Sequence, residues 1–326
     1  MEKTWFLTAL SVLFIIIYFC CGCTKKPEVQ NITFSGMGTI LSVIYAGERN
    51  EAAENAVKKD AETVENELSY YKESSFVSIL NREAHEKETA VPPHVCGLIE
   101  KSLEYGKMSG GFFDITYKST GALWENSGNK IPDDKIIEEK QRFVGEDKLN
   151  VNCSENKIKF AGDGVKIDLG GVAKGYAIDR AGEILKKYGI ENFIVNYGGD
   201  MLICGNKAGK PWTVGIRNPA NQSEILKKIE LSSGCTAIAT SGDYERFFVI
   251  EGQTFSHIVN PKTGHPVKGA KSVTAIGKNA ASTDAAATAV SVALHEKEAV
   301  KKIMEFFNVK IYTLDGDDSV LTEWQL

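Results

Sequence analysis

Asp168-Leu169-Gly170-Gly171-Val172-Ala173-Lys174-Gly175-Tyr176-Ala177-Ile178-Asp179 is the stretch with the strongest local pattern in this chain of 326 residues. A strand is expected to enter it, the glycine pair is expected to turn the backbone, and a helix is predicted from Gly175 to Tyr188. Glycine lets a ligand approach the backbone closely, and a helix N-terminus attracts anions. Because Lys174 adds positive charge, the stretch predicts a phosphate or pyrophosphate site. The structural alternative is a tight turn with Lys174 in solvent.

The segments around this stretch alternate between strand and helix patterns. Helices are predicted at 51–68, 91–108, 283–294 and 297–307. Strands are predicted at 40–45, 149–151, 157–160, 192–197, 212–216, 225–231, 237–240, 245–250, 309–314 and 320–324, with a surface loop at 125–134. No clean strand–helix–strand repetition and no composition break appear. The pattern therefore predicts an α+β or mixed layered fold in one unit.

Asp284-Ala285-Ala286-Ala287-Thr288 is a second candidate site. On a helix, positions i and i+4 lie on one face, one turn apart. A carboxylate and a hydroxyl placed in this way offer two hard oxygen ligands, which suits Mg²⁺ together with phosphate oxygens. The alternative is structural: Asp284 near a helix N-terminus meets the macrodipole, and Thr288 bonds back to the backbone.

A turn rich in hydroxyls, residues 239–246, precedes a segment in which His257 stands shortly before Pro261. A Ser/His/Asp hydrolase is conceivable from these residue types, but the G-x-S-x-G elbow is absent. A single histidine in a predicted strand is more often structural than catalytic. The two segments alone therefore leave the role of His257 open.

Adjacent aromatic residues precede a carboxylate at Phe112-Phe113-Asp114. Such rings could stack on a planar ligand, and the carboxylate could accept hydrogen bonds from ribose hydroxyls or an amino group. The alternative is that both rings belong to the core. Met37 and the pair Tyr70-Tyr71 carry the same ambiguity.

The N-terminus has the pattern of an export signal. Lys3 precedes the apolar run Trp5–Cys21, which ends in Gly22-Cys23 before the chain turns polar. A small residue directly before a cysteine resembles the lipobox of bacterial lipoproteins, so we expect residues 1–22 to be a signal peptide and Cys23 to carry lipid. An uncleaved anchor helix is the alternative, although the run is short for a spanning helix. Both interpretations predict a domain, residues 23–326, held outside the cytoplasm on a bacterial membrane.

Composition excludes some functions. The chain is 43% hydrophobic and 25% charged, with net charge −5 and pI near 5.7, so it lacks the basic character of a nucleic-acid binder. Four cysteines follow Cys23 at wide spacings, with no C-x-x-C pattern: Cys96, Cys153, Cys204 and Cys235. They are interpreted as core residues or disulfides, and their pairing stays open.

The order of the motifs along the chain is more specific than any one of them. The series is Gly36-Met37-Gly38-Thr39, Ser69-Tyr70-Tyr71, Gly111-Phe112-Phe113-Asp114, Asp168–Gly175, Asn196-Tyr197-Gly198-Gly199-Asp200, Trp212–Pro219, Ala239-Thr240-Ser241-Gly242, His257–Gly264 and Asp284–Thr288. This series resembles the FAD:protein FMN transferase family (ApbE), over nearly the whole chain after the lipobox.

The resemblance implies a T-fold-like α+β structure that binds FAD in a cleft between lobes. It implies Mg²⁺ ligands from the side chains of Asp284 and Thr288 and from the carbonyl of Gly171. It also implies FAD contacts at Met37, Tyr71, Phe112, Phe113, Asp114, Asp168, Lys174 and Ile258. The family attaches FMN through a phosphoester to Thr or Ser of flavoproteins, often subunits of membrane redox pumps. Asn260 departs from the family, which usually has Asp before this proline.

A reaction of this kind needs a general base, for which His257 is the candidate, with Asp243 behind it. One alternative uses the same site with water as nucleophile, as a Mg²⁺-dependent FAD pyrophosphatase that yields FMN and AMP. Another is a flavin-binding lipoprotein without turnover, which would not need Asp284 and Thr288. Cytoplasmic thiamine-related synthesis is disfavoured by the export signal.

Overall fold

The computed structural model describes residues 28–242, 247–268, 272–314 and 320–326. The predicted signal peptide, Cys23 and Asp243 lie outside the described residues. No helix in the described ranges has the length and apolar character needed to cross a membrane.

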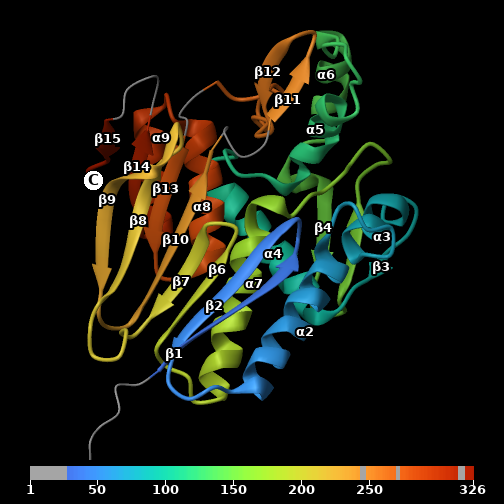
Figure 1. The fold of residues 1–326 in the computed structure, drawn as a ribbon. Coiled ribbons are helices and arrows are strands. Elements are labelled where there is room, and N and C mark those ends of the chain that lie inside the picture. Colours follow the sequence, from blue (N-terminus) through green and yellow to red (C-terminus); the bar gives the residue numbers. More distant parts are fainter. Residues whose placement is uncertain (1–27, 243–246, 269–271, 315–319) are drawn as a thin grey trace, which may run out of the picture.

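An antiparallel sheet of eight strands forms the centre of the fold (Figure 1). Its order is β1-β2-β6-β7-β10-β13-β14-β15, and each neighbouring pair is antiparallel. The strands span β1 (Val29–Gly36), β2 (Thr39–Ala46), β6 (Phe193–Tyr197), β7 (Asp200–Cys204), β10 (Cys235–Ser241), β13 (Ser272–Gly277), β14 (Lys310–Leu314) and β15 (Leu321–Glu323). Strands that are neighbours in the sheet thus come from both halves of the chain.

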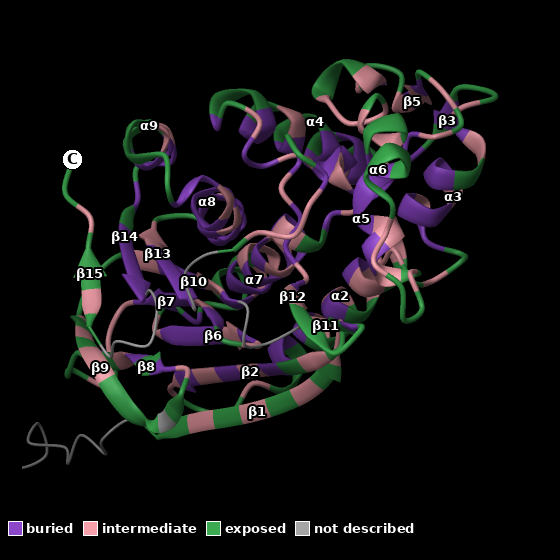
Figure 2. Ribbon diagram, turned by 90° about the horizontal axis from the view of Figure 1, so that it is seen from above, coloured by how far each residue is buried: buried purple, intermediate pink, exposed green. Residues whose placement is uncertain are grey.

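A layer of helices covers one face of this sheet: α2 (Glu51–Leu68), α7 (Gly170–Lys187), α8 (Ala280–Ala293) and α9 (Lys297–Phe307). Figure 2 shows them on one side of the strands. Helix α8 packs on β10 and β13, and α7 packs between α8 and α2. Small residues let the two central helices approach closely, since a Cβ added to Gly175 would lie 2.3 Å from the carbonyl oxygen of Ala280.

The opposite face of the sheet is covered by the hairpin β8 (Trp212–Asn218) and β9 (Asn221–Leu231). Trp212 packs there against Ile194, Ile203 and Ile238. Their neighbours in sequence, Val195, Leu202 and Ala237, belong instead to the large core between the sheet and the helix layer. The alternation follows because successive strand side chains point to opposite faces.

A second, mainly helical lobe is built from residues 76–160 and a distant hairpin. Its elements are α3 (Phe76–Glu83), β3 (Thr89–Ala90), α4 (Pro93–Met108), η1 (Ile115–Tyr117), α5 (Lys118–Glu125), α6 (Asp134–Gln141), η2 (Glu146–Lys148), β4 (Leu149–Asn152) and β5 (Lys157–Phe160). The hairpin β11 (Phe247–Ile250) and β12 (Gln253–Ser256) packs against α5 and α6 through Trp124, Ile137, Ile250 and Val259 (Figure 1). This packing brings the segment after β12 back to the lobe.

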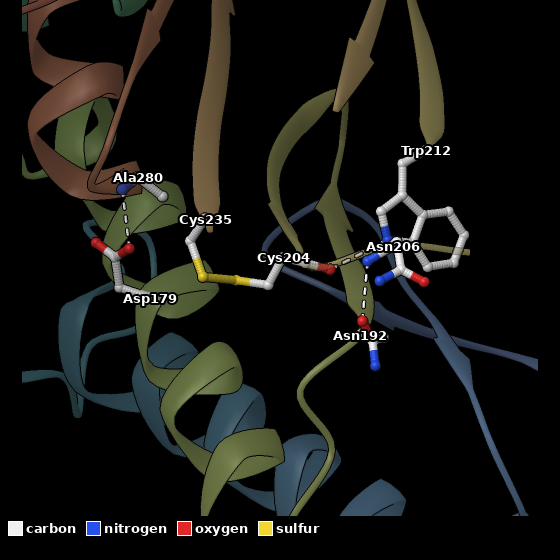
Figure 3. Close-up of a disulfide and its surroundings, with 7 residues drawn as sticks. All are labelled: Asp179, Asn192, Cys204, Asn206, Trp212, Cys235 and Ala280. Carbon is white, nitrogen blue, oxygen red and sulfur yellow. Dashed lines mark hydrogen bonds between the residues drawn. A yellow bond between two sulfur atoms is a disulfide. The ribbon is translucent and has the colours of Figure 1, made fainter. Parts of the chain in front are cut away.

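Two disulfides answer the question of cysteine pairing that the sequence left open. Cys96 on α4 pairs with Cys153, and Cys204 on β7 pairs with Cys235 on β10. Figure 3 shows the second bond joining two neighbouring strands of the large sheet. The indole of Trp212 donates to the carbonyl of Cys204 beside it, at 3.1 Å.

The expected α+β class is confirmed, and the structure moves several predicted boundaries, of which the start of α7 moves furthest. Helix α7 begins at Gly170 and not at Gly175. The amides of Val172 and Ala173 donate to the carbonyl of Leu169, so the glycine pair forms the first helical turn. Neither glycine has positive φ. Their small size therefore serves close approach and not a left-handed turn.

Candidate functional site

The first turn of α7 meets the middle of α8 at the three residues expected to hold a metal. A Cβ built on Gly171 would lie 3.2 Å from Oγ1 of Thr288 and 3.2 Å from the ring of Phe113. One turn further along α7, the backbone N–H of Gly175 donates to Oδ2 of Asp284 at 3.1 Å. Gly171, Asp284 and Thr288 are therefore gathered at one contact between two helices.

Asp284 is almost completely buried, with 3% of its surface exposed. Burial raises its pKa to about 6, a shift that Asp200 reinforces and that Lys174 and the Gly175 N–H oppose. The ammonium of Lys174 lies 3.6 Å from Oδ1 of Asp284. A buried carboxylate of this kind favours a nearby cation, because the ionised form is otherwise poorly solvated.

Asp200 is a second buried carboxylate at this contact, to which the sequence reasoning gave no role. Its Oδ1 accepts from the backbone N–H of Thr240 at 2.9 Å. The Lys174 ammonium lies 2.9 Å from Oδ2, which makes an ion pair without an aligned hydrogen bond. Lys174 thus lies between Asp200 and Asp284 and neutralises part of their charge. The Gly-Gly-Asp end of the predicted strand was the sequence signal that could have indicated Asp200.

A separate polar group surrounds Asp168, just before the first turn of α7. Its Oδ1 accepts from the N–H of Gly170 at 2.9 Å, and its Oδ2 accepts from the hydroxyl of Tyr117 at 3.2 Å. The ammonium of Lys118 lies 3.2 Å from the same Oδ2. Lys118 also lies over the ring of Tyr70, 3.9 Å from its centroid. Sequence reasoning missed Lys118, which nothing in its local pattern distinguishes from a surface lysine.

Phe112 and Phe113 are both buried, as the core interpretation expected, yet both border the candidate site. Phe113 contacts Gly171, and the ammonium of Lys262 lies 3.4 Å from the centroid of the Phe112 ring. Asp114 caps the helix η1 by accepting from the N–H of Thr116 at 2.7 Å. Burial raises the pKa of Asp114, although the hydrogen bonds from Thr116 oppose the shift.

Met37 and Tyr71 lie near opposite ends of a short polar chain. The backbone N–H of Met37, a residue with φ of 45°, donates to Oε2 of Glu65 at 2.9 Å. Glu65 also pairs with Lys72 at 2.9 Å, next to Tyr71 in sequence. Tyr71 is 72% exposed, a high value for a large aromatic ring. The turn between β1 and β2 is thereby fixed beside the end of α2.

His257 follows β12, is half-buried, and does not lie within the strand itself. Ile258 is buried beside it, and its N–H donates to Oγ of Ser256 at 3.1 Å. Asn260 retains the turn expected at this position, because its side-chain oxygen accepts from the N–H of Lys262 at 2.8 Å. The indole of Trp124 donates to the carbonyl of Gly264 and attaches the turn to α5.

The structure therefore brings part of the expected residues together at one contact. The α7–α8 contact gathers four of them: Gly171, Lys174, Asp284 and Thr288. Asp168 lies just before the first turn of α7, and Phe113 packs against Gly171. Ser241, at the end of β10, lies 3.4 Å from Thr288 through their hydroxyls and was not assigned beforehand. No group of three His, Cys, Asp or Glu side chains suited to a metal occurs in the described residues. The predicted metal donors are instead one carboxylate, one hydroxyl and one carbonyl.

Comparisons with known proteins match this arrangement over most of the chain. The model of the ApbE family matches residues 37–311. The chain is 27% identical over 305 residues to an FAD:protein FMN transferase of Vibrio cholerae, covering 90% of this chain and 89% of the relative. It is 27% identical over 315 residues to an FAD:protein FMN transferase of Haemophilus influenzae, covering 91% and 90%.

Solved structures give the same result. The crystal structure of the ApbE protein from Thermotoga maritima superposes with a TM-score of 0.83 at 28% identity, covering 91% of this chain and 97% of that one. A mutant of the flavin transferase ApbE from Vibrio cholerae superposes with a TM-score of 0.79 at 25% identity, covering 91% and 97%.

Proposed function

This chain belongs to the ApbE family, and from that premise we propose that it transfers FMN from FAD to a Thr or Ser hydroxyl of another flavoprotein, with Mg²⁺ bound and AMP released. The relatives that cover most of its length are named FAD:protein FMN transferases. The observation that carries the proposal is the α7–α8 contact, which gathers Gly171, Asp284 and Thr288 beside Lys174.

The donor set at this contact fits Mg²⁺. Asp284 and Thr288 supply hard oxygen atoms, and the ammonium of Lys174 lies 3.6 Å from Oδ1 of Asp284. The carbonyl of Gly171 would be the regular helical acceptor for the N–H of Gly175, but Asp284 competes for that N–H. Mg²⁺ held by these three residues would supply Lewis-acid polarisation of the phosphate oxygens.

The remaining residues suit a dinucleotide that carries a flavin. Tyr71 offers an exposed ring, and Asp168 offers an oriented carboxylate near the N-terminus of α7. Met37, Phe112, Phe113, Asp114 and Ile258 complete the FAD contacts that we propose. Lys174 and the first amides of α7 place positive charge where a pyrophosphate would lie. We therefore propose a cleft between the sheet layer and the helical lobe as the FAD site.

In the proposed reaction, the acceptor hydroxyl oxygen attacks the phosphorus on the FMN side of the pyrophosphate. A new P–O bond forms to the acceptor, the bridging P–O bond breaks, and AMP leaves with the bridging oxygen. The hydroxyl proton passes to a general base, for which His257 is our candidate. Its half-buried place beside the turn anchored by Trp124 gives it a fixed position at the edge of the lobe. Asp243, its proposed partner, lies outside the described residues.

Hydrolysis of FAD by the same site is the second candidate, because nothing in the site residues distinguishes water from a protein hydroxyl. Incubation of the protein with FAD, Mg²⁺ and a flavoprotein acceptor, followed by mass spectrometry, separates the two. An acceptor heavier by one FMN supports transfer. Free FMN and AMP with an unmodified acceptor would support the pyrophosphatase. Intact FAD would support a flavin-binding lipoprotein without turnover.

We also propose that the protein acts outside the cytoplasm, attached to a bacterial membrane by lipid on Cys23. The sequence pattern ending in Gly22-Cys23 motivates this placement, and two disulfides support an oxidising compartment. The test is metabolic labelling with a fatty acid: label should enter the native protein and be absent from a Cys23→Ala variant. Equal labelling of both would refute the lipid site.

A further inference from the structure

Lys118, the first residue of α5, is the most completely enclosed charged side chain near the proposed FAD site. Its side chain has 0% exposure. The ammonium lies 2.5 Å from Oε1 of Glu125, two helical turns further along α5, and 3.2 Å from Oδ2 of Asp168. It also lies 3.9 Å from the centroid of the Tyr70 ring and 5.7 Å from that of Tyr71.

An enclosed ammonium is costly for a fold, because it gives up the hydration of a full charge. Burial acts to lower the pKa of Lys118, but Asp168 and Glu125 together hold that pKa above its ordinary value. The side chain is therefore charged at neutral pH. An apolar side chain of the same length would fill this space without the desolvation cost, so packing alone does not account for a lysine here.

Lys118 contacts Asp168, which is proposed to receive FAD, and the ring of Tyr70, which packs on the proposed FAD contact Tyr71. The carboxylate of Asp168 has two hydrogen-bond donors, Gly170 on Oδ1 and Tyr117 on Oδ2, and an ion pair with Lys118 on Oδ2. These partners fix the plane of the carboxylate, and Asp168 keeps 12% of its side chain exposed, which leaves it accessible to a ligand.

Lys118 also fixes the aromatic pair beside Asp168. The Tyr70 ring lies under the ammonium and stands at 89° to the ring of Tyr71, with centroids 5.5 Å apart. A cation over a ring restrains it, and an edge-to-face pair passes that restraint to the neighbouring ring. Tyr71, which is exposed and proposed to stack on FAD, is thus supported from below by a buried charge.

We propose that Lys118 is a positioning residue for FAD: it holds the Asp168 carboxylate and the Tyr70-Tyr71 pair in the orientation that receives the substrate. The inference rests on the proposed function and adds a residue to it. Lys118 does not touch FAD, because its ammonium is sealed beneath these groups. Its contribution is preorganisation, so its loss should weaken substrate binding more than the chemical step.

The principal test is Lys118→Met, which keeps the length of the side chain and removes its charge. We expect the KM for FAD and the Kd from flavin fluorescence to rise about ten- to hundredfold, with kcat changed less than about threefold. Lys166→Met is the matched control. Lys166 is also partly buried and lies two residues before Asp168, but its ammonium donates to the carbonyl of Asn81. That variant should bind FAD as the wild type does.

A double-mutant cycle tests whether Lys118 acts through Asp168. In an Asp168→Asn background, adding Lys118→Met should raise the Kd for FAD by a smaller factor than in the wild type, because only the contribution of the Tyr70-Tyr71 pair remains to be lost. An equal factor in both backgrounds would overturn the coupling to Asp168, and wild-type KM and Kd in a folded Lys118→Met protein would overturn the whole inference. If Lys118→Met alone does not fold by circular dichroism, Lys118→Met with Glu125→Gln, which removes the excess buried negative charge, takes the same binding test. Failure of the wild type to bind FAD would instead refute the proposed function.

Discussion

The backbone N–H of Gly175 on α7 donates to Oδ2 of Asp284 on α8, with 3.1 Å between nitrogen and oxygen. This hydrogen bond is possible because the two helices approach so closely that a Cβ on Gly175 would lie 2.3 Å from the carbonyl oxygen of Ala280. The position of the carboxylate and the spacing of the helices thus depend on the same glycine.

Replacing Gly175 by alanine should therefore damage both stability and metal binding. The added methyl group meets backbone atoms that cannot rotate away, so we expect the free energy of unfolding to fall by about 1–3 kcal/mol. The matched control is Gly97→Ala on α4, where an added Cβ meets nothing within 4 Å. That change should be neutral or stabilising by about 0.5–1 kcal/mol. Urea denaturation measures both, and equal stability of the two variants would contradict the tight α7–α8 contact.

Mg²⁺ binding should weaken in acid because it requires the ionised form of Asp284. The pKa of this buried carboxyl is raised to about 6, so below that pH each unit should weaken Mg²⁺ binding about tenfold. The rise in melting temperature on adding Mg²⁺ at a fixed concentration reports this affinity. The rise should be large at pH 7.5 and much smaller at pH 5. A rise that stays constant between these values would show that Asp284 is not a ligand.

Asp179 on α7 should make stability depend on pH by a different route. Its carboxylate accepts from the first two amides of α8, Ala280 and Ala281, at 2.8 and 2.9 Å (Figure 3 shows the first). Burial nevertheless raises its pKa to about 6, against the opposing effect of these two hydrogen bonds.

Because the folded-state pKa of Asp179 is raised above 3.8, its contribution is fully present at low pH and lost as the pH rises through 6. Relative to an Asp179→Asn variant, which does not titrate there, the wild type should lose roughly 2–3 kcal/mol of stability between pH 4 and pH 7. Urea unfolding of both proteins across this range provides the measurement. If the stability of the wild type relative to Asp179→Asn stayed constant or increased as the pH rises, the hydrogen bonds would outweigh burial.

The disulfide between Cys204 and Cys235 should stabilise the fold by shortening the loops of the unfolded chain. The bond closes a loop with a sequence separation of 31 residues. Replacing both cysteines by serine should therefore lower the free energy of unfolding by about 2–4 kcal/mol. In a control, dithiothreitol reduces this bond together with Cys96–Cys153 and so tests the loss of the bonds without introducing serine. Unchanged stability of the wild type under full reduction would contradict this account.

Local sequence pattern was sufficient to predict the bounds of an element whose apolar residues recur with a clear period. The helix at 51–68 was predicted with its observed bounds, because its apolar residues recur at helical spacing, and the structure adds Asn50 as its N-cap. The strand β13 (Ser272–Gly277) was missed, although Gly269 before it and Gly277 and Asn279 at its end are turn residues of the kind that mark strand ends. The start of α7 was placed five residues late, because a glycine pair usually indicates a turn, whereas here it permits close packing.

Contacts between residues far apart in the sequence could not be predicted from local pattern, because they depend on how the elements pack. Lys118 is buried by Asp168, fifty residues further along, and by the ring of Tyr70 in the turn after α2. Nothing within α5 indicates that burial. Cys204 and Cys235 are likewise made partners by the pairing of β7 with β10 in the sheet. Asp284 and Thr288 could be proposed because four residues separate them on one helix, but their approach to Gly171 required the packing of α8 on α7.

The most direct test of the central claim is mass spectrometry of a flavoprotein acceptor after incubation with FAD, comparing the wild type with Asp284→Asn at the same Mg²⁺ concentration. Asp60→Asn, which changes a carboxylate on α2 paired with Arg180, serves as the control. We predict that the wild type and the control add one FMN to an acceptor hydroxyl only when Mg²⁺ is present, and that Asp284→Asn adds none. FMN transfer by Asp284→Asn at the wild-type rate, or by the wild type in excess EDTA, would contradict the account.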